Sequence, residues 1–363
     1  MIRITLTASI LGITTLLSCN RTDFKKPEEV IKSYRTLTNE DKNEKVYDEF
    51  LSSKSKEFVT KDEFLKDRFK SDSISSSRMV LESKISSFPL DVNNPSYRRF
   101  KVDEKSVFKK DTIYSRFYYS LINENGEWKI IWINTLLSFA SKKYADGNYS
   151  EARKTLDKII EIDPFSGTAY DFLAWCFLRD NSLTKNEWEN GIVKNAKYAV
   201  TLEEDVFSHY NTLASYYSSI GNIDLEIQNF ERGLLYCQNN DERSLFYSNL
   251  VGSHISKGNY DKAEDFVKKS IEINDKDAFA WFKYGTLMQA QNKNDKALEY
   301  FEKALKQNKM ENSLQGSLYY SYSLSCLKNG KCDIAKEYIN KALDIEPNNS
   351  SYQSLFNQIK YCN

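Results

Sequence analysis

The residues best suited to chemistry in this chain of 363 residues are two histidines, His209 and His254, and six cysteines. No carboxylate or cysteine lies at ligand spacing beside either histidine, so we expect no metal site. The chain also lacks the G-x-S-x-G, P-loop and G-x-G-x-x-G motifs. We therefore expect no catalytic residue and no cofactor, and the sequence predicts a protein that is not an enzyme.

Five of the cysteines are scattered over the second half of the chain: Cys176, Cys237, Cys326, Cys332 and Cys362. No C-x-x-C pair occurs among them, which argues against zinc. We expect Cys176 and Cys237 to be buried free thiols on helices. The other three lie close in sequence, and the spacing leaves open whether two of them form a disulfide.

The remaining cysteine, Cys19, follows an uncharged, mainly apolar run over residues 4–17. A helix of that length measures about 21 Å, too short for a bilayer core of about 30 Å, so the run predicts a signal peptide and not a permanent span. The residues Leu16-Leu17-Ser18-Cys19 resemble a bacterial lipobox. The resemblance implies cleavage before Cys19 and attachment of lipid to its thiol.

The predicted N-terminal organisation is thus a lipoprotein signal peptide over residues 1–18 and a tether over residues 19–25. A secretory peptide cut at small residues is the alternative, although no A-x-A-like site lies nearby. Two or three acyl chains give stable anchoring where a single chain is marginal. Asn20 stands where some bacterial lipoproteins carry an aspartate that retains them in the inner membrane. We therefore expect a lipid-anchored protein of the bacterial cell envelope, in the outer membrane.

Composition excludes some other classes. Lys+Arg and Asp+Glu both number 51, so no net charge attracts a phosphate backbone, and we expect no nucleic-acid partner. Only 12 glycines and 5 prolines occur, which disfavours turn-rich all-β folds and predicts a mainly helical chain.

Residues 26–134 change from helical to strand periodicity. Strands are expected near 78–88, 96–105, 111–123 and 127–133, with a tight turn at Asn123-Glu124-Asn125-Gly126. This order, ending in Gly126-Glu127-Trp128-Lys129-Ile130, resembles the nuclear transport factor two-like superfamily, which implies an α+β domain shaped as a cone.

Members of that superfamily are sometimes enzymes or ligand binders. This domain has no histidine, so an Asp/His pair is absent, and strand tyrosines such as Tyr114, Tyr118 and Tyr119 are more often packing residues. We expect a noncatalytic cone. The alternative function left open is a ligand-binding lipoprotein that holds a small apolar molecule in the cone.

The remaining chain repeats a short turn motif, as in Gly147-Asn148-Tyr149, Gly221-Asn222-Ile223 and Gly258-Asn259-Tyr260. Each is followed by a small residue and an apolar ladder, which is typical of stacked helical arrays. The pattern from Trp281 to Ala304 resembles the tetratricopeptide repeat (TPR). The fold predicted for residues 135–349 is an α-solenoid of about six TPR helix pairs, and a capping helix over 350–363 opens with a capping box at Ser350.

In TPR proteins the first helix of each pair lines a groove that binds a protein or peptide. Mapping those positions gives a hydroxylated, aromatic and nearly uncharged set that includes Trp175, Asn211, Ser215, Phe282, Gln289 and Tyr320. The lysines and arginines with which some TPR domains grip chaperone carboxylates are missing. We therefore predict an adaptor whose groove holds a partner segment on aromatic anchors, while packing between repeats is an equal alternative for each aromatic.

Overall fold

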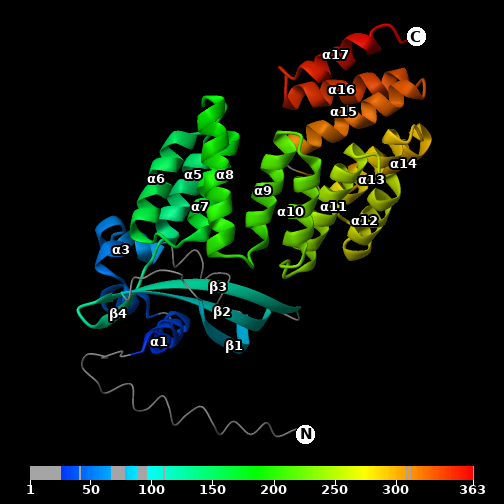
Figure 1. The fold of residues 1–363 in the computed structure, drawn as a ribbon. Coiled ribbons are helices and arrows are strands. Elements are labelled where there is room, and N and C mark those ends of the chain that lie inside the picture. Colours follow the sequence, from blue (N-terminus) through cyan, green and yellow to red (C-terminus); the bar gives the residue numbers. More distant parts are fainter. Residues whose placement is uncertain are drawn as a thin grey trace, which may run out of the picture. The chain divides into compact units, whose positions relative to one another are not determined.

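The computed structural model describes residues 26–40, 42–66, 78–88, 96–108, 111–307, 310 and 312–362. The predicted signal peptide, Cys19 and the tether lie outside the described residues. The chain is mainly helical, and a small antiparallel sheet in its N-terminal part precedes a helical stack (Figure 1). It divides into two compact units, one holding the described residues up to 142 together with 157–165, the other holding 143–156 and 166 onwards.

The N-terminal unit begins with short helices, whose bounds are α1 (Pro27–Asn39), α2 (Asn43–Lys45), a π-helical turn η1 (Val46–Phe50) and α3 (Ser53–Phe58). Pro27 occupies the first turn of α1, where its missing N–H costs nothing. Thr60 and Glu63 form a capping box, because the Glu63 N–H donates to Thr60 Oγ1 at 3.3 Å and the Thr60 N–H donates to Glu63 Oε2 at 2.9 Å.

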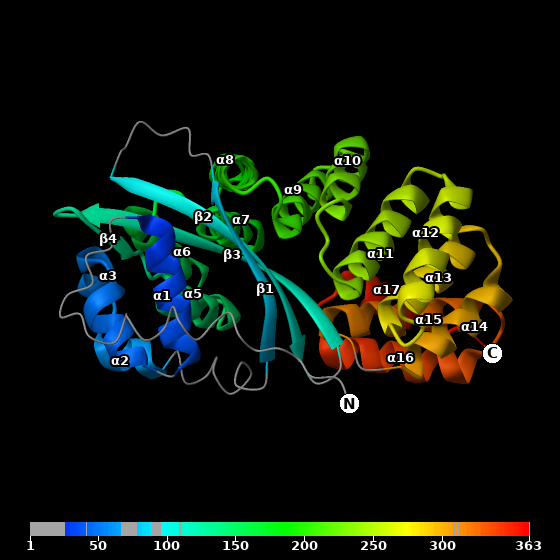
Figure 2. The ribbon, with the colours of Figure 1, turned by 90° about the horizontal axis from the view of Figure 1, so that it is seen from below.

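Four strands follow in the order β1 (Arg78–Phe88), β2 (Tyr97–Phe108), β3 (Asp111–Glu124) and β4 (Glu127–Ile130). All neighbouring pairs are antiparallel, and α1 lies along one face of the sheet (Figure 2). Asn125 and Gly126 have φ of 55° and 90°, the left-handed conformations that a two-residue hairpin requires. The four predicted strands and their hairpin are confirmed.

Aromatic side chains fill the space between this sheet and its helices. The ring centroids of Phe64 and Trp132 are 5.0 Å apart, and those of Tyr34 and Tyr119 are 5.7 Å apart. Phe50, Phe64 and Phe100 are almost fully buried. Packed aromatic rings therefore occupy part of the space between the sheet and its helices.

Six helix pairs and a last helix make up the rest of the described chain. Their bounds are α5 (Asn134–Ala145), α6 (Tyr149–Ile162), α7 (Gly167–Arg179), α8 (Lys185–Leu202), α9 (Phe207–Ser219), α10 (Ile223–Leu234), α11 (Asn240–Ser256), α12 (Tyr260–Ile273), α13 (Ala278–Ala290), α14 (Asn294–Leu305), α15 (Asn312–Lys328), α16 (Cys332–Ile345) and α17 (Ser350–Ile359).

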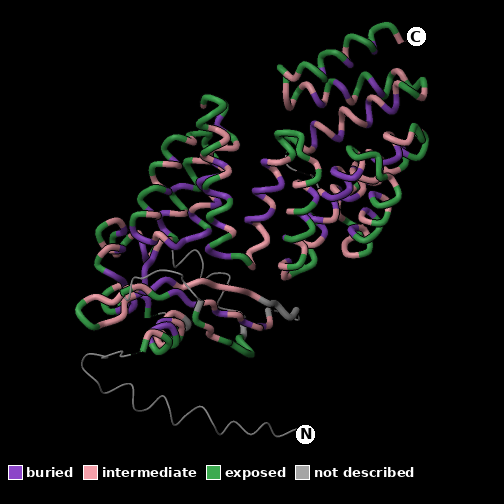
Figure 3. The backbone as a smooth tube through the Cα atoms, in the orientation of Figure 1, coloured by how far each residue is buried: buried purple, intermediate pink, exposed green. Residues whose placement is uncertain are grey.

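In five of the six pairs the turn between the two helices contains a left-handed residue. Gly147, Gly221, Gly258 and Gly330 have φ between 69° and 76°, and Asn292 has φ of 59°. Where the sequence predicted small residues after these turns, Ala152, Ala263, Ala297 and Ala335 are fully buried. Buried residues alternate with exposed ones along each helix, as Figure 3 shows, so the helices bury one stripe each.

The cap differs from its prediction in one respect. Asn349, not Ser350, is the N-cap of α17: its Oδ1 accepts from the Ser351 and Tyr352 N–H groups. The predicted capping box at Ser350 is therefore wrong, because the side chain of Gln353 donates instead to the Pro347 carbonyl at 2.8 Å.

The question left open for the last cysteines is answered by a disulfide between Cys332 and Cys362, whose Cα atoms are 5.8 Å apart. It joins the first residue of α16 to the segment after α17. Cys326 is a buried free thiol, as are Cys176 and Cys237, for which this was predicted.

Candidate functional site

We define the inner surface of the stack by the first helices of its pairs, α7, α9, α11, α13 and α15, together with α17. Four pairs of these helices contact each other: α7 with α9, α11 with α13, α13 with α15, and α15 with α17, whereas α11 contacts the third pair mainly through α10. The second helices, α8, α10, α12, α14 and α16, form the outer row. A stack of this kind presents its first helices on one continuous surface, which is where solenoids bind partners.

Five of the six groove residues predicted from the sequence lie on this surface with part of each side chain exposed. They are Trp175 on α7, Asn211 and Ser215 on α9, Gln289 on α13, and Tyr320 on α15. The amide of Gln289 also bridges two helices, since its Nε2 donates to Ser325 Oγ at 3.0 Å. Arg179 lies over the Trp175 ring, 5.9 Å from its centroid.

The sixth residue, Phe282, needs a correction. Its side chain is 7% exposed, and its ring packs 6.0 Å from that of Phe301 and 6.5 Å from that of Phe279. Of the two interpretations weighed for this ring, packing between helices is therefore the right one. The half-exposed ring of Phe279, one turn earlier on α13, was missed by the sequence mapping.

A recess of about 360 Å³ lies between α15 and α17. Tyr320, whose ring stacks on Tyr352 with centroids 5.2 Å apart, forms one wall. The other lining residues are neutral, with apolar side chains beside hydroxyl and amide groups: Leu324, Ser350, Ser351, Ser354, Leu355 and Gln358. Such a lining suits an uncharged segment that both buries apolar surface and forms hydrogen bonds.

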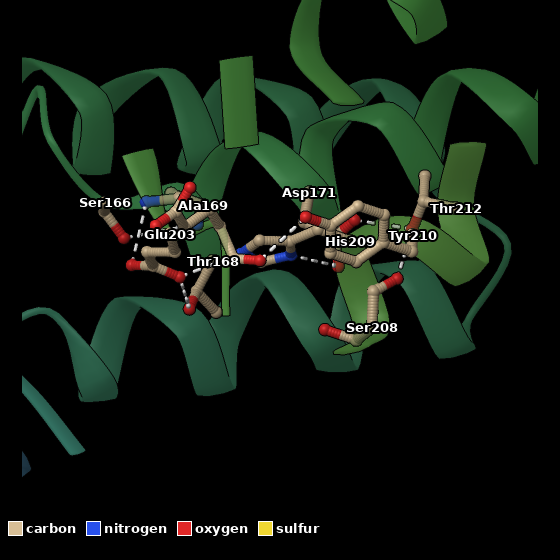
Figure 4. A network of polar contacts seen from close by, with 11 residues as sticks. Ser166, Thr168, Ala169, Asp171, Glu203, Ser208, His209, Tyr210 and Thr212 are labelled. Atoms are coloured by element: carbon tan, nitrogen blue, oxygen red, sulfur yellow. Dashed lines mark hydrogen bonds and ion pairs between the residues drawn. The ribbon is translucent and has the colours of Figure 1, made fainter. Parts of the chain in front are cut away.

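A buried polar network joins α7 to the beginning of α9, as Figure 4 shows. His209 Nε2 lies 2.9 Å from Glu203 Oε2, and its Nδ1 lies 3.3 Å from Asp171 Oδ2 in an ion-pair contact without hydrogen-bond geometry. Glu203 is fully buried and also accepts from the Gly167 N–H at 3.1 Å. Thr212 Oγ1 donates to Asp171 Oδ1 at 2.5 Å.

The two carboxylates determine the charge of His209. Burial by itself lowers the pKa of an imidazole, but Asp171 and Glu203 more than offset that effect and raise the pKa of His209 to about 9. At neutral pH the ring therefore carries a positive charge between two acids. This arrangement is a buried ion cluster that ties two successive repeats together, and none of its atoms faces the inner surface recess.

The sequence reasoning missed this network. It looked for carboxylates at metal-ligand spacing and found none, whereas Glu203 precedes His209 by six residues in the α8–α9 connection and Asp171 lies one repeat earlier. Aligning the repeats could have found this contact, because Asp171, the fifth residue of α7, faces His209, the third residue of α9. Asp171 is buried for this reason.

The other candidate residues do not gather into a chemical site. His254 lies on α11, and burial lowers its pKa, so it is neutral at pH 7. Burial raises the pKa of the Cys176 and Cys237 thiols to about 12, which keeps both in the unreactive thiol form. Within the described ranges, no group of three or more acidic, histidine or cysteine side chains is arranged to hold a metal ion.

None of the helices in the described part of the chain combines the length and the apolar character needed to cross a bilayer.

Three segments match known protein families. Residues 246–277, 278–309 and 316–349 each match the tetratricopeptide repeat. These matches coincide with the pairs α11/α12, α13/α14 and α15/α16. A search of curated proteins finds no match for this chain.

Several solved structures are similar to part of this chain. PilF of Pseudomonas aeruginosa is 15% identical with a TM-score of 0.48, over 62% of this chain and 96% of that one. PilW, described as a type IV pilus biogenesis factor, is 15% identical with a TM-score of 0.49, over 61% and 97%. MamA is 22% identical with a TM-score of 0.38, over 48% and 90%. The chain contains tetratricopeptide repeats, in a helical stack that follows a small N-terminal sheet.

Proposed function

We propose that this chain is a lipid-anchored adaptor of the bacterial cell envelope that binds a protein or peptide partner on the inner surface of its helical stack. The observation that carries the proposal is the presence of TPR repeats whose first helices expose neutral polar and aromatic side chains. Repeats of this kind present extended surfaces that bind other proteins. The lining of the α15–α17 recess, neutral and partly apolar, suits the same use.

The anchor is proposed from the sequence around Cys19. Lipid on that cysteine would attach the chain to the outer membrane, and the absence of net charge leaves lipid as the means of attachment. The N-terminal unit, which we place in the nuclear transport factor two-like superfamily, then serves as a noncatalytic domain between the anchor and the stack. The aromatic rings packed in its interior disfavour the alternative of a ligand-binding cone.

Site-specific photocrosslinking tests the binding surface. A photoreactive amino acid is placed at Ser215 on the inner surface or, as a control, at Lys269, an exposed residue on the outer helix α12. Irradiation of intact membranes should give a defined protein adduct from position 215 and none from position 269. Equal adducts from both positions, or none from position 215, would contradict an adaptor that works through the inner surface.

The anchor is tested separately. We expect the wild type to fractionate with membranes and its N-terminal peptide to carry the mass of a lipidated Cys19. Cys19→Ser should release the protein from membranes. Retention of the variant in the membrane fraction, or an unmodified Cys19 in the wild type, would show that lipid is not the anchor.

A further inference from the structure

Lys283 is a charged residue of the inner surface that no ion pair described so far neutralises. It lies on α13 and points its ammonium at α11, where a Cβ added to Gly252 would be 3.3 Å from Nζ. The ammonium also lies 4.9 Å from the centroid of the Phe279 ring and 6.0 Å from that of Phe282. Two ring faces and a glycine backbone thus surround the cation.

No carboxylate among the described residues pairs with this cation. Lys283 has neither a hydrogen bond nor an ion pair there, whereas Lys268 and Lys303 nearby each contact a glutamate of their own helix at 2.8 Å. The negative charge of Glu226 raises the pKa of Lys283. The Glu226 carboxylate, however, accepts its hydrogen bond from Ser253 Oγ, at 2.7 Å. Lys283 is therefore a half-buried cation that has no ion-pair or hydrogen-bond partner among the described residues.

Such a placement is costly for the folded chain. Burial lowers the pKa of Lys283, and the opposing effect of Glu226 does not restore it. Ring faces attract a cation but accept no conventional hydrogen bond from it, so they do not replace a carboxylate as partner of the ammonium. A carboxylate brought to this point from outside would supply the acceptors and the opposite charge together.

We propose that Lys283 recognises an aspartate or glutamate side chain of a partner segment bound on the inner surface, with an apolar neighbour of that residue packed on Phe279. This inference rests on the proposed function and adds the chemistry of the partner to it. It concerns a single cation between α11 and α13. It is distinct from the multi-lysine sets that grip chain-terminal carboxylates, which this sequence lacks.

The test uses short random peptides with amidated ends, selected on the full chain without its signal peptide. We expect peptides retained by the wild type to be enriched in Asp or Glu at one position. Replacing that acid by its amide should weaken binding to the wild type by about tenfold or more, the range for a hydrogen bond to a charged group. The same replacement should change binding to Lys283→Met by less than about twofold.

Lys269→Met is the matched control. Lys269 also lies over a ring, 5.3 Å from the centroid of Phe266, but it is exposed on the outer helix α12. Lys269→Met should bind the acidic peptide more tightly than its amide by the same factor as the wild type does. If the retained peptides show no enrichment of Asp or Glu, or if Lys283→Met still prefers the acid, the inference about Lys283 is wrong while the proposed function stands. Retention of no peptide at all would overturn the proposed function with it.

Thermal unfolding separates recognition from a structural role. If the cation serves a partner, Lys283→Met removes the cost of burying it, so the variant should unfold at the same temperature as the wild type or higher. A clear decrease in unfolding temperature would show that Lys283 stabilises the fold itself and would contradict the proposal.

Discussion

Nε2 of His209 lies 2.9 Å from Oε2 of Glu203, and both side chains are buried almost completely. Glu203 follows α8 and His209 lies in the first turn of α9, while the third member, Asp171, belongs to α7. Apolar side chains pack between other repeats, as around Phe246 and Phe301. The junction between the second and third pairs is held by a charged cluster that is almost completely buried.

Removing the cation should destabilise the protein strongly. His209→Gln leaves Asp171 and Glu203 buried without a positive partner, and breaking a buried ion pair on one side costs about 3–5 kcal/mol. Chemical denaturation at pH 7 should therefore show a decrease of that order in the free energy of unfolding. His254→Gln is the control, because neither ring nitrogen of His254 has a hydrogen-bond partner. A His209→Gln variant as stable as His254→Gln would contradict the role assigned to the cluster.

The contribution of His209 should depend on pH in a defined direction. Its pKa is about 9 in the folded chain, above the ordinary value of 6.5 that applies after unfolding. The stabilisation is therefore complete below about pH 6.5, declines above it, and is lost as the pH rises through about 9. The difference in unfolding free energy between wild type and His209→Gln should decrease from pH 6.5 to pH 10. A difference that stays constant would mean that the ring is not charged.

Gly167 should tolerate no side chain. A Cβ at this position would lie 2.6 Å from Glu203 Cδ, so Gly167→Ala has to displace the buried carboxylate that accepts from the Gly167 N–H. We expect a loss of about 1–3 kcal/mol in stability despite the helix propensity of alanine. At Gly252, in contrast, the added Cβ meets only the flexible end of Lys283 at 3.3 Å. Gly252→Ala should be neutral or stabilising in the same denaturation experiment.

The disulfide should stabilise the last helix. Cys332 and Cys362 are separated by 30 residues, and closing a loop of that size contributes about 2–4 kcal/mol. Hydrogen exchange of the α17 amides should become faster in Cys362→Ser and, to a similar degree, in wild type treated with a reducing agent. Reduction should leave Cys362→Ser unchanged. Equal exchange rates in oxidised and reduced wild type would show that apolar packing alone holds the cap.

Much of the fold follows from local sequence signals. The hairpin at Asn125-Gly126 and the left-handed turns at Gly147, Gly221 and Gly258 need residue types that few amino acids supply, so short local motifs predicted their positions. The strands were predicted for the same reason, since period-two alternation fixes which residues share a face.

Contacts between repeats were harder to predict. Phe282 and Phe279 are three residues apart on α13, and only the packing of Phe301 beneath the helix decides which of the two rings is buried. Asp171 similarly looks like a surface residue until His209 of the next repeat is placed beside it. The N-cap of α17 fell one residue from its predicted place because both Asn349 and Ser350 have suitable side chains, and only the backbone decides between them.

The bond between Cys332 and Cys362 also changes how the stack would respond to force. Cys362 lies beyond the end of α17, so a pull on the C-terminal end of the chain passes through the sulfur atoms to the beginning of α16. Both α16 and α17 lie inside the closed loop and bear little of that load. Mechanical unfolding from this end should therefore begin with α15, not with the peeling away of α17.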